Sequence, residues 1–465
     1  MKRVIPLLLA LVCLSACGPA GQDASIDAPT TTASRTTDVS TTTAILSTED
    51  TTATEDTTAT ETTGNVTTSS STTVVGKFTT IPHDRTTTVK ATTGKTTKKT
   101  TKTTKKTTKA TTTKPISAEK RWYLSLVTSE NKWIATCQLS NGAIAMTPTR
   151  NGTVKINPYF ADIAALSLLN QADIYADHVR RYMDWHFNHL NTAQSDPSGV
   201  DGTIFDWQAT MKDGKMMSEE WVTAVPTYDS VDSYAATFLM VVEKYVARTK
   251  DTAYAVKNVA KIKRVVSALF AMMDNGLTVG KPNSPVKMLM DNCEVYAGLQ
   301  ATTRLYRDVL VPAGAVASSE VTSLMNATAD MAAHVESDLW AGTYYRNDIM
   351  QSGDSFYPFS WSQYYPSATA QTYPIIYGLI TPSSERAGKL YEQFCYKYNW
   401  ENLNHPDDYV WASNAYTAAV MGDTARVKAF LTAYEKMVTA SRGYPLYNAD
   451  AAWACMTAYY MSQVR

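Results

Sequence analysis

Residues 228–239 read YDSVDSYAATFL, and this stretch decides the expected fold. Its polar start, with Asp229 and Asp232 one helical turn apart, gives way to the apolar run 234–242 (YAATFLMVV). A helix that is apolar around its whole circumference is buried on all sides. We therefore expect this helix to lie in the interior of a domain built from helices.

Helices of this kind recur along the chain. Apolar runs rich in small residues stand at 161–169, 412–420 and 451–459, whereas 257–273 (KNVAKIKRVVSALFAMM) carries lysines on one wet side. Gly and Pro residues between the helical segments divide the domain into twelve predicted helices. These alternate between amphipathic helices and helices that are apolar all round. They cover 118–138, 158–170, 174–193, 229–249, 252–274, 286–311, 315–338, 367–380, 384–398, 407–422, 423–440 and 449–464.

Alternation of helices that expose one side to solvent with helices that are buried on all sides predicts two concentric rings. Six hairpins, each with one outer and one inner helix, would form an all-α (α/α)6 toroid. An irregular helical array or a solenoid is the alternative, although no fixed sequence period supports a solenoid repeat. Strand-like alternation is confined to one candidate ribbon near residues 202–221.

The N-terminal part of the chain differs from the rest in charge and in amino-acid composition. The 465 residues carry 43 Lys+Arg and 43 Asp+Glu, but residues 1–115 have a net charge of +5 and residues 116–465 one of −5. Residues 18–115 contain 39 threonines and a single aromatic residue, Phe78. Such a segment cannot offset the entropy lost on ordering. We expect a disordered linker over 17–115 and a globular domain over 116–465.

The first residues predict export. Lys2 and Arg3 precede the apolar run 4–12, and Leu14-Ser15-Ala16-Cys17 follows. This is the pattern of a secretory signal peptide over 1–16, and its end resembles the bacterial lipobox, in which the cysteine is lipidated. A plain signal peptide with a chance cysteine is the alternative. We expect a lipid-anchored protein of the cell membrane that faces the extracellular side.

The cysteines and histidines do not predict a metal site. The domain cysteines lack the CxxC spacing of zinc and redox sites, so buried free thiols are expected, with one disulfide left open. The HxxH pair His186 and His189 is expected on the surface of the third helix. Glu219 and Glu220 could be solvated charge. No metal and no cofactor are expected. The four domain cysteines are Cys137, Cys293, Cys395 and Cys455.

The segments that lead into the buried helices share a composition of acids or amides with aromatic residues. Because the inner helices of a toroid run in one direction, these segments should meet at one end of the ring. Capping explains single acids at helix starts. It does not explain the aromatics, which would line a cleft with flat faces that suit sugars. The segments are 156–160 (INPYF), 228–234 (YDSVDSY), 290–296 (MDNCEVY), 361–366 (WSQYYP), 405–411 (HPDDYVW) and 443–450 (GYPLYNAD).

Cleavage of a glycosidic bond needs two carboxyl groups, one protonated and one ionised. Pairs at i, i+3 spacing and an acid in the 194–228 connection supply the candidates. The predicted catalytic residues are Asp206, Asp229, Asp232, Asp291 and Glu294. The predicted substrate-binding residues are Asn141, Asn157, Tyr159, Trp207, Tyr228, Tyr296, Tyr409, Trp411 and Tyr447.

Several of these stretches resemble the six-hairpin glycosidase superfamily, and the likeness covers nearly all of 118–465 at the level of pattern. The resemblance implies an (α/α)6 fold with a carbohydrate cleft at the N-terminal ends of the inner helices. The stretches are 140–144 (SNGAI), 156–160 (INPYF), 202–207 (GTIFDW), 228–239 (YDSVDSYAATFL) and 291–299 (DNCEVYAGL).

Within the superfamily, the nearest named comparison is to the family 8 glycoside hydrolases, inverting enzymes that act on β-linked chains. Their Asp-x-Asp motif is similar to Asp229-Ser230-Val231-Asp232, which is one residue longer. Their general acid is a glutamate before a glycine, where this chain has Asn141-Gly142. Asparagine cannot protonate a leaving group, so that mechanism does not transfer. Another carboxyl group, such as Asp206 or Asp232, would supply the acid.

The leading hypothesis is a surface-anchored glycoside hydrolase that cleaves a polysaccharide or oligosaccharide by carboxylate acid/base catalysis. A non-catalytic glycan-binding lipoprotein on the same fold and a polysaccharide lyase are the alternatives. Expected partners are a carbohydrate polymer and, through the lipid anchor, a membrane. The basic end of the linker could also contact anionic cell-wall polymers, although simple solvation is the favoured interpretation. The acidic domain argues against nucleic acid, and a monomer is expected.

Overall fold

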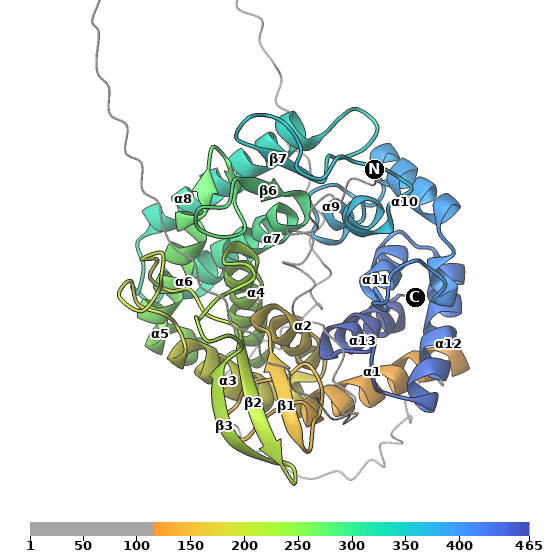
Figure 1. Ribbon diagram of the computed structural model, residues 1–465, viewed down its shortest axis with the longest axis horizontal. Helices are drawn as coiled ribbons and strands as arrows, with labels where there is room; N and C mark the ends of the chain where they lie inside the picture. Colours follow the sequence, from red (N-terminus) through yellow and green to blue (C-terminus); the bar gives the residue numbers. More distant parts are fainter. Residues whose placement is uncertain (1–115, 465) are drawn as a thin grey trace, which may run out of the picture. The chain divides into compact units, whose positions relative to one another are not determined.

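The computed structural model describes residues 116–464, which form a closed ring of helices (Figure 1). This is the predicted all-α toroid. The predicted signal peptide, Cys17 and the linker over 17–115 lie outside the described residues. The outer helices are α1 (Ala118–Thr136), α3 (Ala172–Asn188), α5 (Thr252–Lys257), α6 (Val259–Ala271), α8 (Ser318–His334), α10 (Glu385–Lys397) and α12 (Thr424–Ala440). The inner helices are α2 (Pro158–Leu168), α4 (Asp232–Thr249), α7 (Leu289–Leu305), α9 (Tyr373–Ile376), α11 (Ser413–Val420) and α13 (Asn448–Gln463).

The inner helices form an unbroken circle. Each packs against the next in the order α2, α4, α7, α9, α11 and α13, and α13 packs against α2. Small residues permit this close approach: a Cβ atom added to Gly298 on α7 would lie 2.7 Å from the Cα atom of Ala236 on α4. The small residues Gly298 and Ala236 therefore lie at the contact between α7 and α4.

The helix α2 shows why these segments become inner helices. The Asn157 side chain caps it by accepting a hydrogen bond of 3.2 Å from the backbone N–H of Phe160. Pro158 occupies the first turn, where its missing N–H costs nothing. Apart from Tyr159 and Phe160, all of α2 is buried. Burial on all sides follows from its apolar circumference, as the sequence predicts.

The eighth predicted helix, 367–380, is the largest departure from the expected fold. It is replaced by a helical turn at Tyr364–Ala368 and the short helix α9 at Tyr373–Ile376. Pro374 lies in the first turn of α9, where it starts a helix but could not continue one. Gly378, at a φ of +76°, ends it.

Three other helices begin or break at places that the periodicity does not reveal. α4 begins at Asp232, so Asp229 lies in the loop before it and not within the helix. α11 begins at Ser413 and not at 407, because Trp411 has a φ of +50°, outside the range of a right-handed helix. The fifth predicted helix is divided at Asn258 into α5 and α6.

Short strands occupy the loops at one end of the ring. The predicted ribbon is the antiparallel pair β2 (Trp207–Lys212) and β3 (Lys215–Trp221), and β1 (Gly152–Ile156) joins it along β2. In this sheet Ile156 pairs with Trp207, and Ala209 pairs with Glu219. Two smaller pairs complete the strands among the described residues: β4 (Met273–Asp274) with β5 (Leu277–Thr278), and β6 (Val286–Met288) with β7 (Asp348–Met350).

The first and last helices close the ring. α1 packs on α13, and the Trp122 Nε1 atom donates to Glu435 on α12 at 3.0 Å. Glu130 of α1 is fully buried and accepts two hydrogen bonds from Arg442, at 2.7 and 2.8 Å. Tyr434 of α12 donates to the same carboxylate at 2.7 Å. A charged cluster inside the domain thus joins α1 to α12 and to the segment that follows it.

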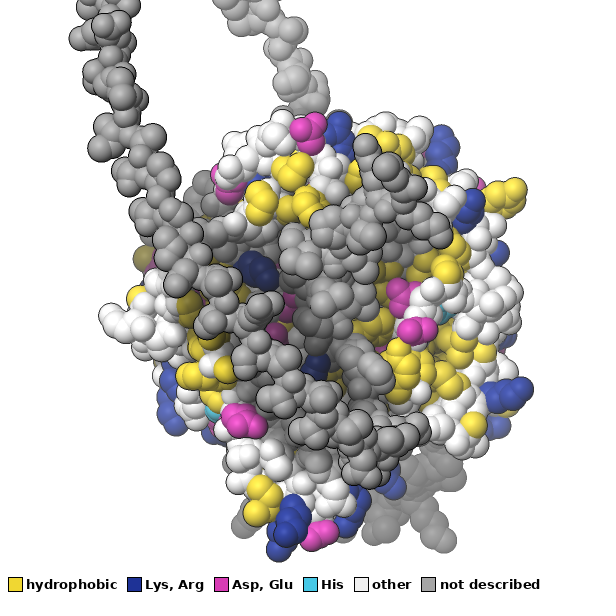
Figure 2. Space-filling view, in the orientation of Figure 1, with side chains coloured by type: hydrophobic (Ala, Val, Ile, Leu, Met, Phe, Trp, Pro, Cys, Tyr) yellow, Lys and Arg dark blue, Asp and Glu magenta, His cyan; other side chains and the backbone are white. Residues whose placement is uncertain are grey.

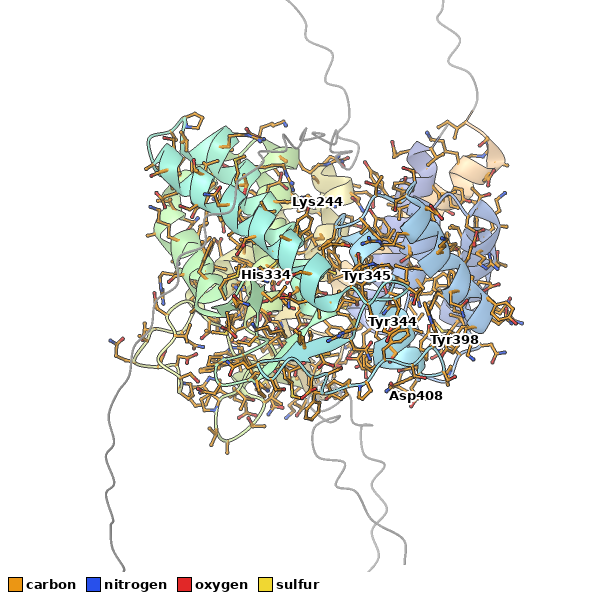
Figure 3. The ribbon with its side chains drawn as sticks, turned by 90° about the horizontal axis from the view of Figure 1, so that it is seen from above. Lys244, His334, Tyr344, Tyr345, Tyr398 and Asp408 are labelled. Atoms are coloured by element: carbon orange, nitrogen blue, oxygen red, sulfur yellow. The ribbon has the colours of Figure 1, made fainter. Side chains whose placement is uncertain are left out.

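The ring has two distinct ends. Asp408 lies at the end where the inner helices begin, and Lys244 on α4 lies toward the other end (Figure 3). Lys244 donates to the Leu166 carbonyl of α2 at 2.8 Å and to Asn170 at 3.1 Å, and burial lowers its pKa to about 8.

None of the helices within 116–464 has both the length and the apolar character of a membrane span. The four domain cysteines are free thiols.

Candidate functional site

The starts of the inner helices meet at one end of the ring, which we call the mouth. Side-chain hydrogen bonds link residues at the helix starts with residues of the neighbouring segments. They include Asn157 to Tyr234 at 2.7 Å, Thr278 to Asp232 at 2.7 Å, Tyr377 to Glu294 at 3.3 Å and Asn414 to Tyr364 at 2.9 Å. Figure 2 shows both acidic and basic side chains on this face of the ring.

Asp206 lies at the base of the β2–β3 hairpin and reaches into the mouth. Its Oδ1 atom accepts hydrogen bonds from Tyr234 at 2.9 Å and from Asn157 at 3.2 Å. Burial and the neighbouring charge of Asp229 raise its pKa to about 7, although the Tyr234 hydroxyl acts in the opposite direction. At neutral pH about half of the Asp206 carboxyl groups therefore carry a proton.

Asp229, in the loop before α4, is partly exposed. Burial raises its pKa to about 6, and the charge of Lys281 acts in the opposite direction. Asp229 is therefore mostly ionised at pH 7 while Asp206 is half protonated. Two carboxyl groups whose pKa values are raised toward neutrality thus lie in one site, where acid/base chemistry can use them.

Asp232 is the first residue of α4 and is fully buried. Ser230 and the backbone N–H of Ser233 donate to its Oδ1 atom at 2.7 and 2.8 Å, and Thr278 donates to Oδ2. Burial raises its pKa. Both carboxyl oxygens are occupied by protein donors, so Asp232 fastens the start of α4 to the β5 strand.

Asp291 and Glu294 stand one turn apart on α7. Burial, followed by the charges of Asp232, Glu294 and Asp229, raises the pKa of Asp291 well above its usual value. Burial also raises the pKa of Glu294 to about 7, although Tyr159 and Tyr377 donate to its Oε1 atom, Tyr159 at 2.6 Å. The structure thus brings all five predicted catalytic carboxyl groups into one electrostatically coupled cluster.

Aromatic rings form a continuous arc along one side of the mouth. The neighbouring ring centroids lie 6.0 Å apart for Tyr159 and Phe160, 5.9 Å for Phe160 and Tyr447, and 5.9 Å for Tyr447 and Tyr409. Trp411 continues the arc at 6.1 Å from Tyr409. Four of the predicted substrate-binding aromatics therefore belong to this arc.

The other five predicted substrate-binding residues lie outside this aromatic arc. Trp207 packs edge-on against His189 and neighbours Trp221 on β3. Tyr228 is buried against Phe205. Tyr296 is buried within α7. The remaining two are amides that bond to acids. Asn157 donates to Asp206, and Asn141 donates to Glu219 at 2.8 Å.

The predicted set lacks Asp450, a buried acid of the mouth. Asp450 lies in the first turn of α13, and in the order of the inner helices α13 stands opposite α7. Burial raises its pKa to about 7, although backbone N–H groups of Tyr447, Ala412 and Trp411 bond to it. The segment 448–450 (NAD) at the start of an apolar helix is the sequence signal that could have identified Asp450.

The prediction that His186 is a surface residue is wrong. Its side chain is 1% exposed and stacks on Phe238 with the ring centroids 3.5 Å apart. Burial lowers the pKa of His186 well below its usual value, so the ring is neutral. The helix α3 turns this side toward α4, which the HxxH spacing does not show. Within the described range 116–464, no group of three or more His, Cys, Asp or Glu residues could hold a metal ion.

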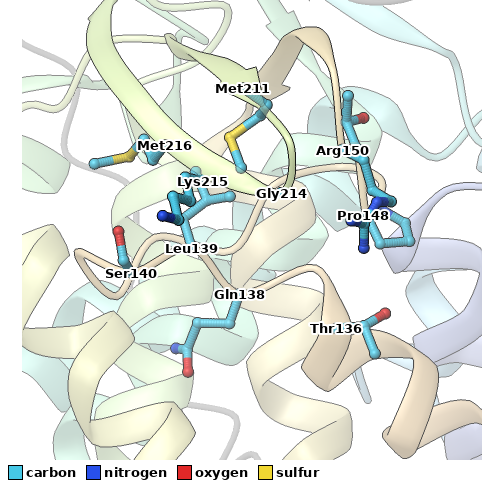
Figure 4. Close-up of a pocket in the computed structure, with 11 residues that line it drawn as sticks. Thr136, Gln138, Leu139, Ser140, Pro148, Arg150, Met211, Gly214, Lys215 and Met216 are labelled. Atoms are coloured by element: carbon cyan, nitrogen blue, oxygen red, sulfur yellow. The ribbon is translucent and has the colours of Figure 1, made fainter.

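A cavity of about 510 Å³ lies away from the carboxyl cluster, beneath the turn of the β2–β3 hairpin (Figure 4). It is bounded by the segment after α1 and by the hairpin turn, and none of its lining residues is an acid. Arg150 and Lys215 lie on opposite sides of it. Since hydrolysis by carboxyl groups needs acids, the mouth and not this cavity is the candidate active site.

No protein-family model matches the sequence, and no curated protein matches it. Solved structures of glycosidases do match the fold. A wild-type glycosidase superposes with a TM-score of 0.51 at 14% identity, over 74% of this chain and 97% of that chain. A glycosidase variant in complex with glucose gives a TM-score of 0.52 at 14% identity, over 74% of this chain and 99% of that chain. The helical ring of this protein thus has the same overall fold as these structures.

Proposed function

We propose that this protein is a surface-anchored glycoside hydrolase. The observation that carries the proposal is the carboxyl cluster of the mouth, in which Asp206 and Asp229 are partly exposed and differ in pKa. The aromatic arc beside the cluster suits the flat faces of sugar rings. The six-hairpin resemblance and the glycosidase-type fold support the same conclusion.

Asp206 is the proposed proton donor. Its pKa of about 7 keeps it half protonated at neutral pH, and its side chain is partly exposed at the mouth, where a glycosidic bond can reach it. Asp229, with a pKa of about 6, is the proposed ionised partner, acting as base or nucleophile. Asp291 and Glu294 are proposed to hold the sugar from α7, because their raised pKa values favour protonated groups that can donate hydrogen bonds.

A panel of purified polysaccharides and oligosaccharides tests the proposal. The full chain should release new reducing ends from at least one glycan without absorbance from unsaturated products. Binding on a glycan array without release of reducing ends would favour a glycan-binding lipoprotein. Unsaturated products would favour a lyase. Neither binding nor cleavage across the panel would contradict all three functions.

The anchoring proposal rests on residues 1–17, where Leu14-Ser15-Ala16-Cys17 is similar to the lipobox. Lipidation at Cys17 followed by the threonine-rich stretch would hold the domain of 116–465 at a distance from the membrane. The Cys17→Ser variant should move from the membrane fraction to the soluble exported fraction, as immunoblotting of fractionated cells would measure. Cys13→Ser is the matched control and should stay with the membranes. Equal distribution of both variants would contradict lipidation at Cys17.

A further inference from the structure

A carboxylate outside the catalytic cluster is bonded by three side chains from two other segments of the chain. The Oε1 atom of Glu219, on β3, accepts hydrogen bonds of 2.8 Å from Asn141 Nδ2 and 2.8 Å from Trp185 Nε1. Its Oε2 atom lies 2.9 Å from His189 Nε2. Burial acts to raise the pKa of Glu219, but the hydrogen bonds and the charge of His189 bring it below its usual value. Glu219 is therefore an ionised group and not a proton donor.

His189 is held between two acceptors. Its Nδ1 atom lies 2.7 Å from the Trp185 carbonyl oxygen and its Nε2 atom 2.9 Å from the Glu219 carboxylate. A carbonyl oxygen and an ionised carboxylate both accept hydrogen bonds, so both ring nitrogens face acceptors. Its ring also stacks on Trp185, with the centroids 4.4 Å apart. The His189–Glu219 contact is thus a salt bridge between α3 and β3.

This salt bridge lies close along the sheet to Asp206. Glu219 pairs with Ala209 on β2, and Trp207, the residue after Asp206, packs edge-on against His189 with ring centroids 4.7 Å apart. The backbone of Asp206 continues the hairpin, because the Val222 N–H donates to its carbonyl at 3.2 Å. The position of the hairpin on α3 therefore sets the position of Asp206.

We propose that His189 and Glu219 are positioning residues for Asp206, which they hold in the mouth by fastening the β2–β3 hairpin to α3. The proposal rests on the proposed function, because it assigns the pair a part in the same reaction. It also gives Asn141 a definite part, since Asn141 donates to Glu219 and thereby ties the loop after α1 to the same hairpin.

Glu220 supplies a matched control on the same strand. It is the next residue of β3, it is exposed, and it accepts a hydrogen bond from Gln208 at 3.2 Å. Successive side chains of a strand point to opposite faces. Glu220→Gln and Glu219→Gln therefore make the same chemical change one position apart, but only Glu219→Gln removes the charge that pairs with His189.

Hydrogen exchange followed by mass spectrometry tests the positioning directly and without substrate. Glu219→Gln and His189→Gln should each increase exchange in the peptide 204–212, which contains Asp206, and Glu220→Gln should leave it as in the wild type. Exchange in 204–212 that is the same in all variants would overturn the proposal.

Kinetics of glycan hydrolysis test the consequence for the reaction. A displaced catalytic group costs on the order of 10²-fold in rate per ångström, so Glu219→Gln and His189→Gln should lower kcat by about tenfold to a hundredfold with little change in KM. The double variant should lose no more than either single variant, because both remove one interaction. Wild-type values of kcat in Glu219→Gln would overturn the proposal. A wild type that cleaves no glycan would instead contradict the proposed function, and the exchange experiment would still decide whether the pair positions Asp206.

Discussion

Asp206→Asn should lower kcat for glycan hydrolysis by about 10²–10⁴-fold, the usual contribution of a general acid or base. Asparagine keeps the size of the side chain, and its amide oxygen can still accept the hydrogen bonds from Tyr234 and Asn157. Only the transferable proton is lost, so the melting temperature should stay close to that of the wild type. Release of reducing ends under saturating substrate is the measurement.

The matched control for Asp206→Asn is Asp213→Asn. Asp213 lies in the exposed turn of the same hairpin, and its φ of +53° is a conformation that asparagine adopts readily. This variant should hydrolyse glycans at the wild-type rate. Full activity in Asp206→Asn, or equal losses in both variants, would contradict the role of Asp206.

The dependence of wild-type activity on pH tests the proposed roles of Asp206 and Asp229. A proton donor must be protonated, and the pKa of Asp206 is raised to about 7, so kcat should fall tenfold per pH unit well above pH 7. The ionised partner Asp229, with a pKa of about 6, must lose its proton, so activity should also fall well below pH 6. Because the two groups interact, the two limbs report apparent values of the pair.

Arg442→Met should lower the free energy of unfolding by about 3–5 kcal/mol, because it leaves a buried charge without its partner. Glu130 has no exposed side-chain surface and accepts both hydrogen bonds of the Arg442 guanidinium, at 2.7 and 2.8 Å. Tyr434 remains as a donor to this carboxylate but carries no positive charge. Urea unfolding with linear extrapolation is the measurement.

Lys428→Met is the control for Arg442→Met. Lys428 on α12 pairs with Glu119 on α1 at 2.7 Å, and both side chains are about half exposed, at 50% and 49%. Exposed ion pairs contribute little because water screens them. The free energy of unfolding of Lys428→Met should therefore match that of the wild type. A small loss in Arg442→Met, equal to that of the control, would contradict the importance of the buried pair.

The ring of helices is predictable from the sequence because its signal is local. The runs at 161–169 and 234–242 show by composition that they have no wet face, and α2 and α4 are buried accordingly. The eighth predicted helix, 367–380, does not form, and the reason is also local. Pro374 and Gly378 outweigh the apolar pattern around them, since Pro374 removes a donor and Gly378 leaves the helical region.

The carboxyl cluster is only partly predictable. The i, i+3 spacing places Asp291 and Glu294 on one side of α7, and the start of a buried helix marks Asp232. Asp206 is partly exposed and Asp232 is buried because of how the segments around them pack, and nothing in the local sequence distinguishes the two residues.

The contact between His189 and Glu219 joins residues 30 positions apart and depends on how the hairpin sits on α3. Local patterns therefore present both as ordinary surface charges. Lipidation of Cys17, membrane anchoring and membership of the six-hairpin superfamily stay predictions.

Ring closure also has a consequence for the order in which the domain can fold. Trp122 and Glu435, which bond across the seam, are 313 positions apart in the chain. Contacts of such high sequence separation form only after the entropy of a very long loop has been lost, and they slow folding. Each helical hairpin can form early from neighbouring segments. The seam between α1 and the helices α12 and α13 cannot form until both of these helices have been synthesised.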